Sequence, residues 1–544
     1  MNMNLLGIIR NYLLAFSVFL LLFSCADDTW NQHYESNLNQ TSDKTLWTHL
    51  LEQDSLSQFR EVLDSVKVMN GHKITSVRYS ELLKDQFFTV FAPIDHSFNK
   101  DSLLALCATT EGNMKVEEQF IMSHLSRSSY SLSPYTKSLV RMLNGKYLPF
   151  TDSTLADVSL IVPQSNLLAK NGLIHFLKGN IPFVKNIFET IVELPEYSGM
   201  GAFLSKYQKD SLNEAASLVA GINDMGVPVY VDSVIIEKNQ LLNSFGLLNT
   251  EDSSYIMVAP SKAGWDNAYA KVVKYFNYGN INGADSLRSY WTNFSLMKDL
   301  FFNKTMQLSP QDSLISTQYW NKNPKQHVFY KPFKSGGILD GAVAVKASNG
   351  IIYKVPTWPF NFESVFFTPI VTEAESDKNI SSVNKELFNL YQRQYFADSV
   401  SNNGYLEIIP KTPSVQTDIT FSIPNTLSGK YDVCIVMLPK NITDPTDKRG
   451  NKFSAFLTYN QANGTTPTIL QCKSQGGATY FTNNINKVDT VLLTTIALPS
   501  CNYKQTKVAV TVHLKSIVTQ KEINAKTFTN QMYIDCLYLK PRQD

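Results

Sequence analysis

Two short motifs each occur twice in this chain of 544 residues, in the same order and at similar spacing. The first is a run of alternating β-forming residues that ends in Ala-Pro, at Pro93 and again at Pro260. The second is an Asn-Gly pair followed by a short apolar run, at Gly172 and again at Gly350. The motifs lie 79 residues apart in one copy (172 − 93) and 90 apart in the other (350 − 260). This recurring order predicts a tandem duplication of one domain type.

The first motif predicts a strand that leads into a helix. Residues 88–91 alternate in the manner of a strand, and Pro93 ends it because proline has no N–H for a ladder hydrogen bond. Asp95 and Ser97 follow, and both are residue types that cap helix N-termini. We therefore expect a helix to begin at Asp95 or Ser97.

Two histidines of the first copy are candidates for a catalytic role. His124 lies in an apolar segment, and His175 follows the Asn-Gly pair on the strand face opposite Ile174 and Phe176. Neither has a recognisable Ser, Cys or carboxylate partner. The second copy has Tyr353 in place of His175 and no counterpart of His124. We therefore interpret both as structural histidines.

The two motifs resemble the signature boxes of fasciclin domains, T-V-F-A-P-x-D-x-A-F and N-G-x-I-H-x-I followed by a proline. Ser97 stands where that pattern usually has alanine. The resemblance implies two α+β domains, at 43–184 and 185–366, each a β-sandwich or wedge with packed helices. It also implies adhesion or ligand binding rather than catalysis, and it supplies no binding residue.

The first 25 residues have the layout of a bacterial lipoprotein signal peptide. Arg10 precedes the apolar run 12–23, which is shorter than the ~20 residues of a membrane-spanning helix. The following Leu22-Phe23-Ser24-Cys25 resembles a lipobox, in which the cysteine carries a diacylglyceryl thioether. We therefore predict that Cys25 is lipidated and anchors the protein to a membrane.

The residues after Cys25 predict which way the protein faces. Asp27 and Asp28 resemble the surface-export signal of lipoproteins in the Bacteroidetes group, so we expect an outer-membrane protein that faces the cell exterior. Residues 26–42 are polar and aperiodic and are expected to form a tether. The five remaining cysteines lack the spacing of a metal site. Two alternatives stand for them: one disulfide in the last third of the chain, or buried free thiols.

Residues 367–544 predict an all-β, jelly-roll-like sandwich. Alternating or apolar runs separated by Gly, Pro and Asn predict strands at 405–410, 418–424, 431–437, 453–459, 490–498, 507–514 and 532–539. Several short strands at regular intervals are typical of a sandwich or jelly roll. A short helix is expected before them, at about 383–391.

Two loops of this region are candidate ligand sites. Segment 423–431 loosely resembles jelly-roll carbohydrate-binding domains, in which a strand leads into a ligand-presenting loop; a purely structural sandwich is the alternative. The carboxylates of Asp444 and Asp447 could bind calcium. The adjacent cations Lys448 and Arg449, and the absence of an EF-hand pattern, favour a solvated loop instead.

An Asp-Ser-aliphatic tripeptide recurs along the chain. It begins at Asp54, Asp64, Asp101, Asp210, Asp232, Asp285, Asp312 and Asp398, and Asp489-Thr490-Val491 is similar. The pattern resembles the O-glycosylation sequence of Bacteroidetes envelope proteins. Helix N-capping by Asp or Ser is the alternative, and one site can serve both roles.

Charge and motif content exclude several functions. Lys+Arg 49 against Asp+Glu 47 leaves a net charge of +2, which without long basic runs argues against a nucleic-acid partner. The sequence has no Walker loop, Rossmann glycine set, nucleophile elbow or zinc spacing. We therefore predict no catalytic residue, no metal site and no cofactor, and do not expect an enzyme.

The sequence predicts a non-catalytic surface lipoprotein for adhesion or glycan binding, whose partners are glycans or surface proteins. Tandem modules on one tether would gain avidity. The alternative is a structural accessory subunit that packs on the transporter of an outer-membrane polysaccharide uptake complex and has no ligand site. A glycosidase would need paired carboxyl groups about 5–10 Å apart in a deep pocket. The sequence identifies no ligand-binding residue.

Overall fold

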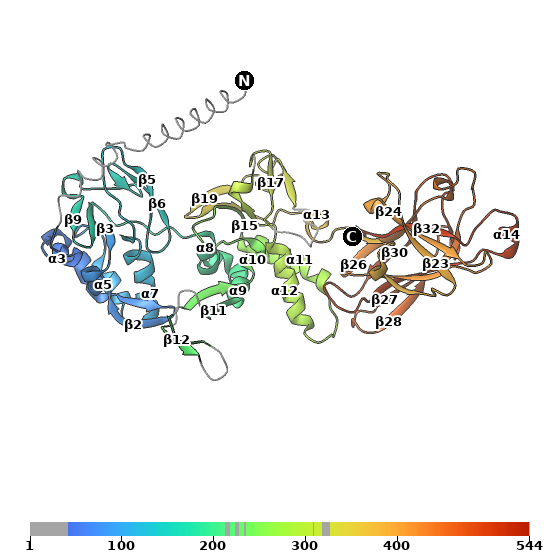
Figure 1. Ribbon diagram of the computed structural model, residues 1–544, viewed down its shortest axis with the longest axis horizontal. Coiled ribbons are helices and arrows are strands. Elements are labelled where there is room, and N and C mark those ends of the chain that lie inside the picture. The colour runs from blue at the N-terminus through green and yellow to red at the C-terminus, as the bar shows by residue number, and fades with distance from the viewer. Residues whose placement is uncertain are drawn as a thin grey trace, which may run out of the picture. The chain divides into compact units, whose positions relative to one another are not determined.

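The computed structural model describes residues 42–212, 218–222, 228–232, 235–307, 309–317 and 327–542. Cys25, the predicted signal peptide and nearly all of the tether lie outside these residues. The chain divides into two compact units, one of 1–184 with 209–238 and one of 185–208 with 239–544 (Figure 1). The expected domain border at 366/367 falls inside the second unit. Among the described residues, no helix is both long and apolar enough to cross a bilayer.

The first unit combines short helices with several small sheets. Its helices are α3 (Leu46–Leu51), α4 (Ser57–Ser65), α5 (Tyr79–Asp85), α6 (Lys100–Leu106) and α7 (Thr110–Val116). The central sheet has the order β4-β3-β10-β9, with β3 (Phe88–Pro93), β4 (Leu125–Ser126), β9 (Leu167–Ala169) and β10 (Gly172–Leu177). The other strands are β1 (Lys67–Asn70), β2 (Lys73–Arg78), β5 (Lys137–Arg141), β6 (Tyr147–Thr151), β7 (Thr154–Leu155), β8 (Val158–Ser159), β11 (Gln208–Leu212), β12 (Leu218–Ile222), β13 (Pro228–Asp232) and β14 (Ile235–Asn239).

The two sequence motifs of each copy form neighbouring parallel strands. In the first unit Val90 of β3 lies opposite Ile174 of β10, and both are fully buried. In the second unit β15 (Tyr255–Pro260) pairs in parallel with β20 (Gly350–Val355), and β16 (Phe301–Asn303) and β19 (Val343–Ala347) complete the order β16-β15-β20-β19. The two sheets thus share one topology, as a duplication requires.

The glycine of each second motif lies against the backbone of the first. A Cβ on Gly172, whose φ is +151°, would lie 1.9 Å from the Phe88 carbonyl oxygen. A Cβ on Gly350 would lie 2.0 Å from that of Tyr255. Only glycine permits such a close approach, so the motif is required for strand pairing as well as for a turn.

The asparagine before each glycine caps the first helix of its copy. The Asn171 Oδ1 accepts from the backbone N–H of Leu46 (2.8 Å), at the start of α3. The Asn349 Oδ1 accepts from that of Ile187 (3.0 Å), at the start of α8 (Ile187–Glu193). Each asparagine thereby satisfies a helix N–H that has no intrahelical partner.

The expected helix start at Asp95 or Ser97 is wrong. Helix α6 begins at Lys100, after an Asn99 side chain that caps it. The Asp95 carboxylate instead accepts from the backbone N–H groups of Ser57 (3.2 Å) and Gln58 (2.8 Å), at the start of α4. Asp95 is therefore a cap, but of a helix that precedes it in the chain by almost forty residues.

Five more α-helices among the described residues of the second unit precede its sandwich. They are α9 (Ser198–Lys206), α10 (Leu242–Phe245), α11 (Lys262–Val272), α12 (Ala284–Met297) and α13 (Phe362–Val365), with a 3-10 turn at Val273–Phe276 after α11. The second unit also contains a two-stranded sheet of β17 (Ser313–Ile315) and β18 (Val328–Tyr330). Figure 1 shows α11 and α12 beside the sheet that contains β15.

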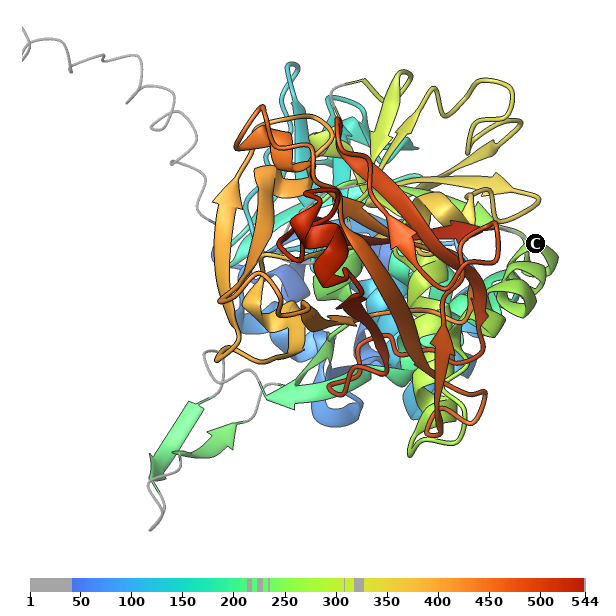
Figure 2. The same cartoon turned by 90° about the vertical axis from the view of Figure 1, so that its right-hand side faces the viewer.

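Residues 370–542 form the predicted β-sandwich, whose strands face the viewer in Figure 2. One sheet has the order β23-β24-β32-β26-β30, with β21 also paired to β32. Its strands are β21 (Ile370–Glu373), β23 (Phe388–Gln394), β24 (Gly404–Pro410), β26 (Gly429–Met437), β30 (Asp489–Leu498) and β32 (Met532–Arg542). The other has the order β22-β25-β31-β27-β28, with β29 paired to β27. Its strands are β22 (Ile380–Val383), β25 (Asp418–Ile423), β27 (Lys452–Asn460), β28 (Pro467–Gln471), β29 (Phe481–Thr482) and β31 (Val510–Ser516); α14 (Gln520–Asn524) follows β31.

The helix expected at 383–391 is wrong, because this segment ends β22 and begins β23. The Asn384 side chain accepts from the backbone N–H of Glu386 (2.9 Å), and the Leu387 N–H donates to the Asn384 carbonyl (3.0 Å). These bonds form a turn, and strand pairing to β24 overrides the local helical spacing.

Candidate functional site

Within the second unit, the second repeat and the sandwich share one continuous hydrophobic core. The segment after α11 enters the sandwich: the Ser428 N–H donates to the Tyr275 carbonyl (2.9 Å), and the Cys501 N–H donates to the Asn277 carbonyl (2.6 Å). Tyr278 is fully buried there. The sandwich loops thus pack directly on this segment of the repeat.

Two glycines allow the backbones to meet at this junction. A Cβ on Gly279, at φ +65°, would lie 2.2 Å from the carbonyl carbon of Asn463. A Cβ on Gly464, at φ +74°, would lie 2.4 Å from the Tyr278 carbonyl oxygen. A side chain at either position would separate the two parts.

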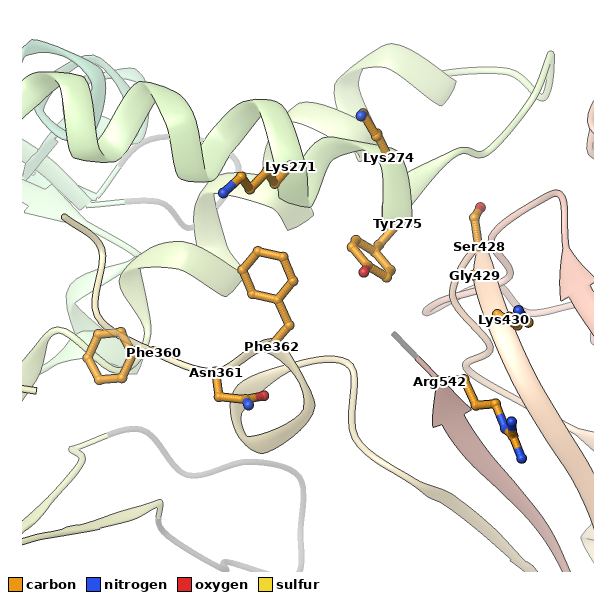
Figure 3. A pocket seen from close by; sticks show the side chains of 10 residues that line it. All are labelled: Lys271, Lys274, Tyr275, Phe360, Asn361, Phe362, Ser428, Gly429, Lys430 and Arg542. Atoms are coloured by element: carbon orange, nitrogen blue, oxygen red, sulfur yellow. The ribbon is translucent and has the colours of Figure 1, made fainter. Parts of the chain in front are cut away.

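An open cavity of about 600 Å³ lies beside this junction, which is within the range of small-molecule sites (Figure 3). One wall comes from residues 271–275 and 360–362 of the second repeat. The other wall comes from the start of β26, the residue before it and the end of β32. The lining residues are Lys271, Lys274, Tyr275, Phe360, Asn361, Phe362, Ser428, Gly429, Lys430 and Arg542. We call this cavity the junction pocket.

Aromatic rings make one wall of the junction pocket. The ring centroid of Tyr275 lies 5.9 Å from that of Phe362 and 4.6 Å from that of Phe367, which also contacts Tyr431 at 5.0 Å. Gly429 lies against this cluster, since a Cβ there would be 2.7 Å from the Phe367 ring. The cluster therefore holds Tyr275 and Phe362 in fixed positions at the pocket wall.

All charged residues that line the junction pocket are cations. Lys271, Lys274 and Lys430 are exposed and form no ion pair with any described residue. The Arg542 Nε donates to Asp432 Oδ2 (2.7 Å). Burial opposes ionisation of Asp432, but hydrogen bonds from Thr495 and Arg542 outweigh it and lower the pKa of that carboxyl. Asp432 therefore stays ionised and orients the guanidinium.

Sequence reasoning found part of this site. Segment 423–431, which resembled a ligand-presenting loop, supplies Ser428, Gly429 and Lys430. It missed Lys271, at the end of α11, and Lys274, three residues later in the following 3-10 turn. The sequence signal for them was a pair of basic residues three positions apart, neither of which has an acidic residue four positions away to pair with.

The two candidate histidines of the first unit are fully buried. The His124 Nδ1 lies 2.7 Å from the Phe120 carbonyl, and its Nε2 accepts from the Ile181 N–H (3.1 Å). The His175 Nε2 lies 2.7 Å from the Tyr130 carbonyl. Burial lowers the pKa of each imidazole to about 4, although the backbone carbonyls oppose this. Neither ring reaches a Ser, Cys or carboxylate among the described residues, in agreement with a structural role.

The loop of Asp444 and Asp447 is tied to its own residues. The Asp447 carboxylate accepts from the Arg449 guanidinium at 2.9 and 2.7 Å, and Asp444 accepts from Thr446 at 2.9 and 2.7 Å. These bonds engage both oxygens of Asp447 and the Oδ1 of Asp444. The five described cysteines are all free, and four of them are buried.

A different cluster of the sandwich offers donor atoms for a metal: one atom each of Glu373, Asp535 and Cys536, all within 4.8 Å of one another. Glu373 and Asp535 both receive hydrogen bonds from Ser401, at 2.6 and 3.1 Å. The Oε2 atoms of Glu373 and Glu375 are buried without a hydrogen-bond partner among the described residues. Burial, with the nearby Glu373 and Glu375 charges, raises the pKa of Asp535 to about 7. Such oxygen donors suit a hard cation such as Ca²⁺. Glu373 is distant in sequence from Asp535 and Cys536, so sequence spacing gave no signal.

No protein-family model and no curated protein match this chain. Solved structures align with parts of it, among them the following three. A Paenibacillus xanthan lyase aligns at 13% identity over 36% of this chain and 16% of the lyase, with a TM-score of 0.21. The CBM22-1–GH10 modules of a Clostridium thermocellum xylanase 10B, complexed with xylohexaose, align at 10% identity over 30% of this chain and 28% of theirs, with a TM-score of 0.18.

The third is CBM32-3 from a family 31 glycoside hydrolase of Clostridium perfringens, at 11% identity over 30% of this chain and 96% of that module, with a TM-score of 0.15. The alignments thus span far less than two thirds of the lyase and of the xylanase modules. TM-scores this low carry no argument about the fold or function of this chain.

Proposed function

We propose that this protein is a non-catalytic glycan-binding protein and that the junction pocket is its binding site. The observation that carries the proposal is the lining of that pocket, which combines the Tyr275 and Phe362 rings with the Asn361 amide and several cations. The apolar face of a sugar ring packs on an aromatic ring, while amide and charged groups bind its hydroxyls.

The lining also explains why we propose binding rather than hydrolysis. Glycoside hydrolysis uses a pair of carboxyl groups. The junction pocket has no Asp or Glu among its described lining residues. It therefore offers contacts for a sugar but no acid and base for its cleavage.

We further propose that the protein is anchored to the outer membrane through lipid on Cys25 and faces the cell exterior, with fasciclin-like repeats in both units. The support for this part comes from the signal-peptide layout and from the sequence motifs. A tether of this kind would present the pocket to soluble or cell-surface glycans.

Calorimetry of the purified full chain against soluble polysaccharides tests the binding proposal. We expect Tyr275→Ala to weaken binding at least tenfold. Tyr330→Ala is the matched control, because Tyr330 is 76% exposed on β18 and does not line the pocket. Thermal melts of both variants check that they fold. No binding to any glycan would contradict the proposal and direct attention to protein partners from outer membranes.

A further inference from the structure

We propose that the junction pocket selects anionic glycans, whose carboxylate or sulfate groups are bound by its lysines and arginine. This inference rests on the glycan-binding function proposed above and adds the chemical class of the ligand. It follows from the charge of the lining, the free state of the lysines and the position of the arginine.

The lining is far more cationic than the rest of the chain. Four of its ten residues are Lys or Arg and none is Asp or Glu, whereas the whole chain has a net charge of only +2. A cavity lined by charges of one sign concentrates field and raises the local concentration of oppositely charged ligands. This effect favours an acidic sugar over a neutral one.

The lysines are available for a ligand. Lys271 comes from the end of α11, Lys274 from the 3-10 turn that follows it, and Lys430 from β26 on the facing side (Figure 3). Because no described carboxylate forms an ion pair with any of the three, an incoming anion does not have to displace an internal partner. Two like charges one helical turn apart also repel each other, and a bound anion would relieve that repulsion.

Asp432 holds the Arg542 side chain in position but does not cover its guanidinium. Its Nε is held by Asp432 at 2.7 Å, yet its side chain remains 53% exposed. The Asp432 side chain is only 10% exposed and also accepts from the Thr495 hydroxyl (2.5 Å). The terminal N–H groups of the guanidinium form no hydrogen bond with another described residue, and their fork matches the two oxygens of a carboxylate or sulfate.

The aromatic wall makes an anionic sugar a better ligand than a bare phosphate. Tyr275 and Phe362 would contribute nothing to a small inorganic anion, whereas both could contact the ring of a uronic acid or a sulfated sugar. Charge and apolar contact together therefore define the ligand class.

Oligogalacturonides and their methyl esters test this inference, because the pair has the same sugar rings with and without charge. Calorimetry of the full chain should give at least tenfold tighter binding of the acid form. Raising NaCl from about 0.05 to about 0.5 M should weaken binding of the acid form but not of the ester. Sulfated chondroitin oligosaccharides form a second arm; tighter binding of these than of the galacturonides would support the same anion chemistry with sulfate as its source.

A variant with Lys271→Ala, Lys274→Ala and Lys430→Ala should lose the preference for the acid form. Lys346→Ala, at an exposed lysine of β19, is the control and should keep it. Equal binding of acid and ester, with loss in Tyr275→Ala, would overturn the anion preference and leave glycan binding intact. No binding of either the acid galacturonides or the sulfated oligosaccharides would overturn the anion preference, and glycan binding itself fails only if no polysaccharide binds at all. Binding only to anionic phospholipid vesicles would overturn this proposal in favour of a membrane surface.

Discussion

The hydroxyl of Tyr278 in the second repeat donates a hydrogen bond to the carbonyl oxygen of Tyr503 in the sandwich, over 3.0 Å. Tyr278 is fully buried, and burial raises the pKa of its hydroxyl far above the usual range. The hydroxyl thus satisfies a polar group inside an apolar junction. This bond helps to hold the two walls of the junction pocket together.

The close backbone approach at Gly279 predicts that one added methyl group there strongly destabilises the second unit. Gly279→Ala should lower the free energy of unfolding of the second unit by at least about 2 kcal/mol, because the new Cβ would overlap Asn463 and the φ of +65° is unfavourable for alanine. Gly283→Ala is the control, since Gly283 has φ +75° and nothing within 4 Å of its Cβ position. Equal losses in chemical denaturation of the two variants would contradict a tight junction.

The buried histidines predict that the first unit loses stability in acid. Both imidazoles have a pKa of about 4 when folded and about 6.5 when unfolded. The unfolded chain therefore binds more protons between these values, and stability is lost as pH falls through that window. Between pH 7.5 and pH 5 the loss should be about 2 kcal/mol per histidine.

Denaturation of the full chain at both pH values, with His124→Gln compared with the wild type, checks this expectation. The variant should lose less stability between the two pH values than the wild type does. An unchanged pH dependence in the variant would show that folding does not lower the pKa of His124.

The buried amine of Lys440 in the sandwich predicts that a substitution at this position stabilises the protein. The Lys440 Nζ is buried without a hydrogen-bond partner among the described residues, 3.6 Å from the centre of the Tyr533 ring, and burial lowers its pKa to about 7. Lys440→Met keeps the apolar stem and should stabilise by about 1–3 kcal/mol at pH 7. The unfolded lysine holds its proton up to about pH 10.4, so the gain should shrink as pH rises towards that value.

Exposed Lys411 gives the control Lys411→Met, which should change stability little at either pH. A loss of stability in Lys440→Met at pH 7 would show that the amine has a partner that the described residues do not contain.

Lipidation predicts the effect of losing one thiol. Cys25→Ala should move the protein from the membrane fraction to the soluble fraction, because the acyl chains would be absent. Cys107→Ala should leave it in the membrane fraction. Cell fractionation and immunoblotting provide the measurement, and tight membrane association of Cys25→Ala would rule out this anchor.

The duplicated motifs could be predicted from sequence because they are local. Alternation around Val90, the Asn-Gly pairs and the strands of the sandwich are all visible within a few residues. The role of Asn171 could not be predicted, because the helix that it caps begins 125 residues earlier in the chain. Asp95 was assigned to the wrong helix for the same reason.

The candidate site was harder to predict because its two walls are far apart in sequence. Lys271 and Lys430 line one cavity only after the segment around Tyr278 packs into the sandwich loops. The helix expected at 383–391 failed because the turn at Asn384 and pairing with β24 outweigh local spacing.

Hydrogen–deuterium exchange of the full chain with a bound acidic oligosaccharide tests the central claim most directly. We predict that backbone protection increases together at 271–275 and at 428–431, while β3 in the first unit is unchanged. Protection confined to the first unit, or to sandwich loops that do not line the junction pocket, would contradict the claim that this pocket is the binding site.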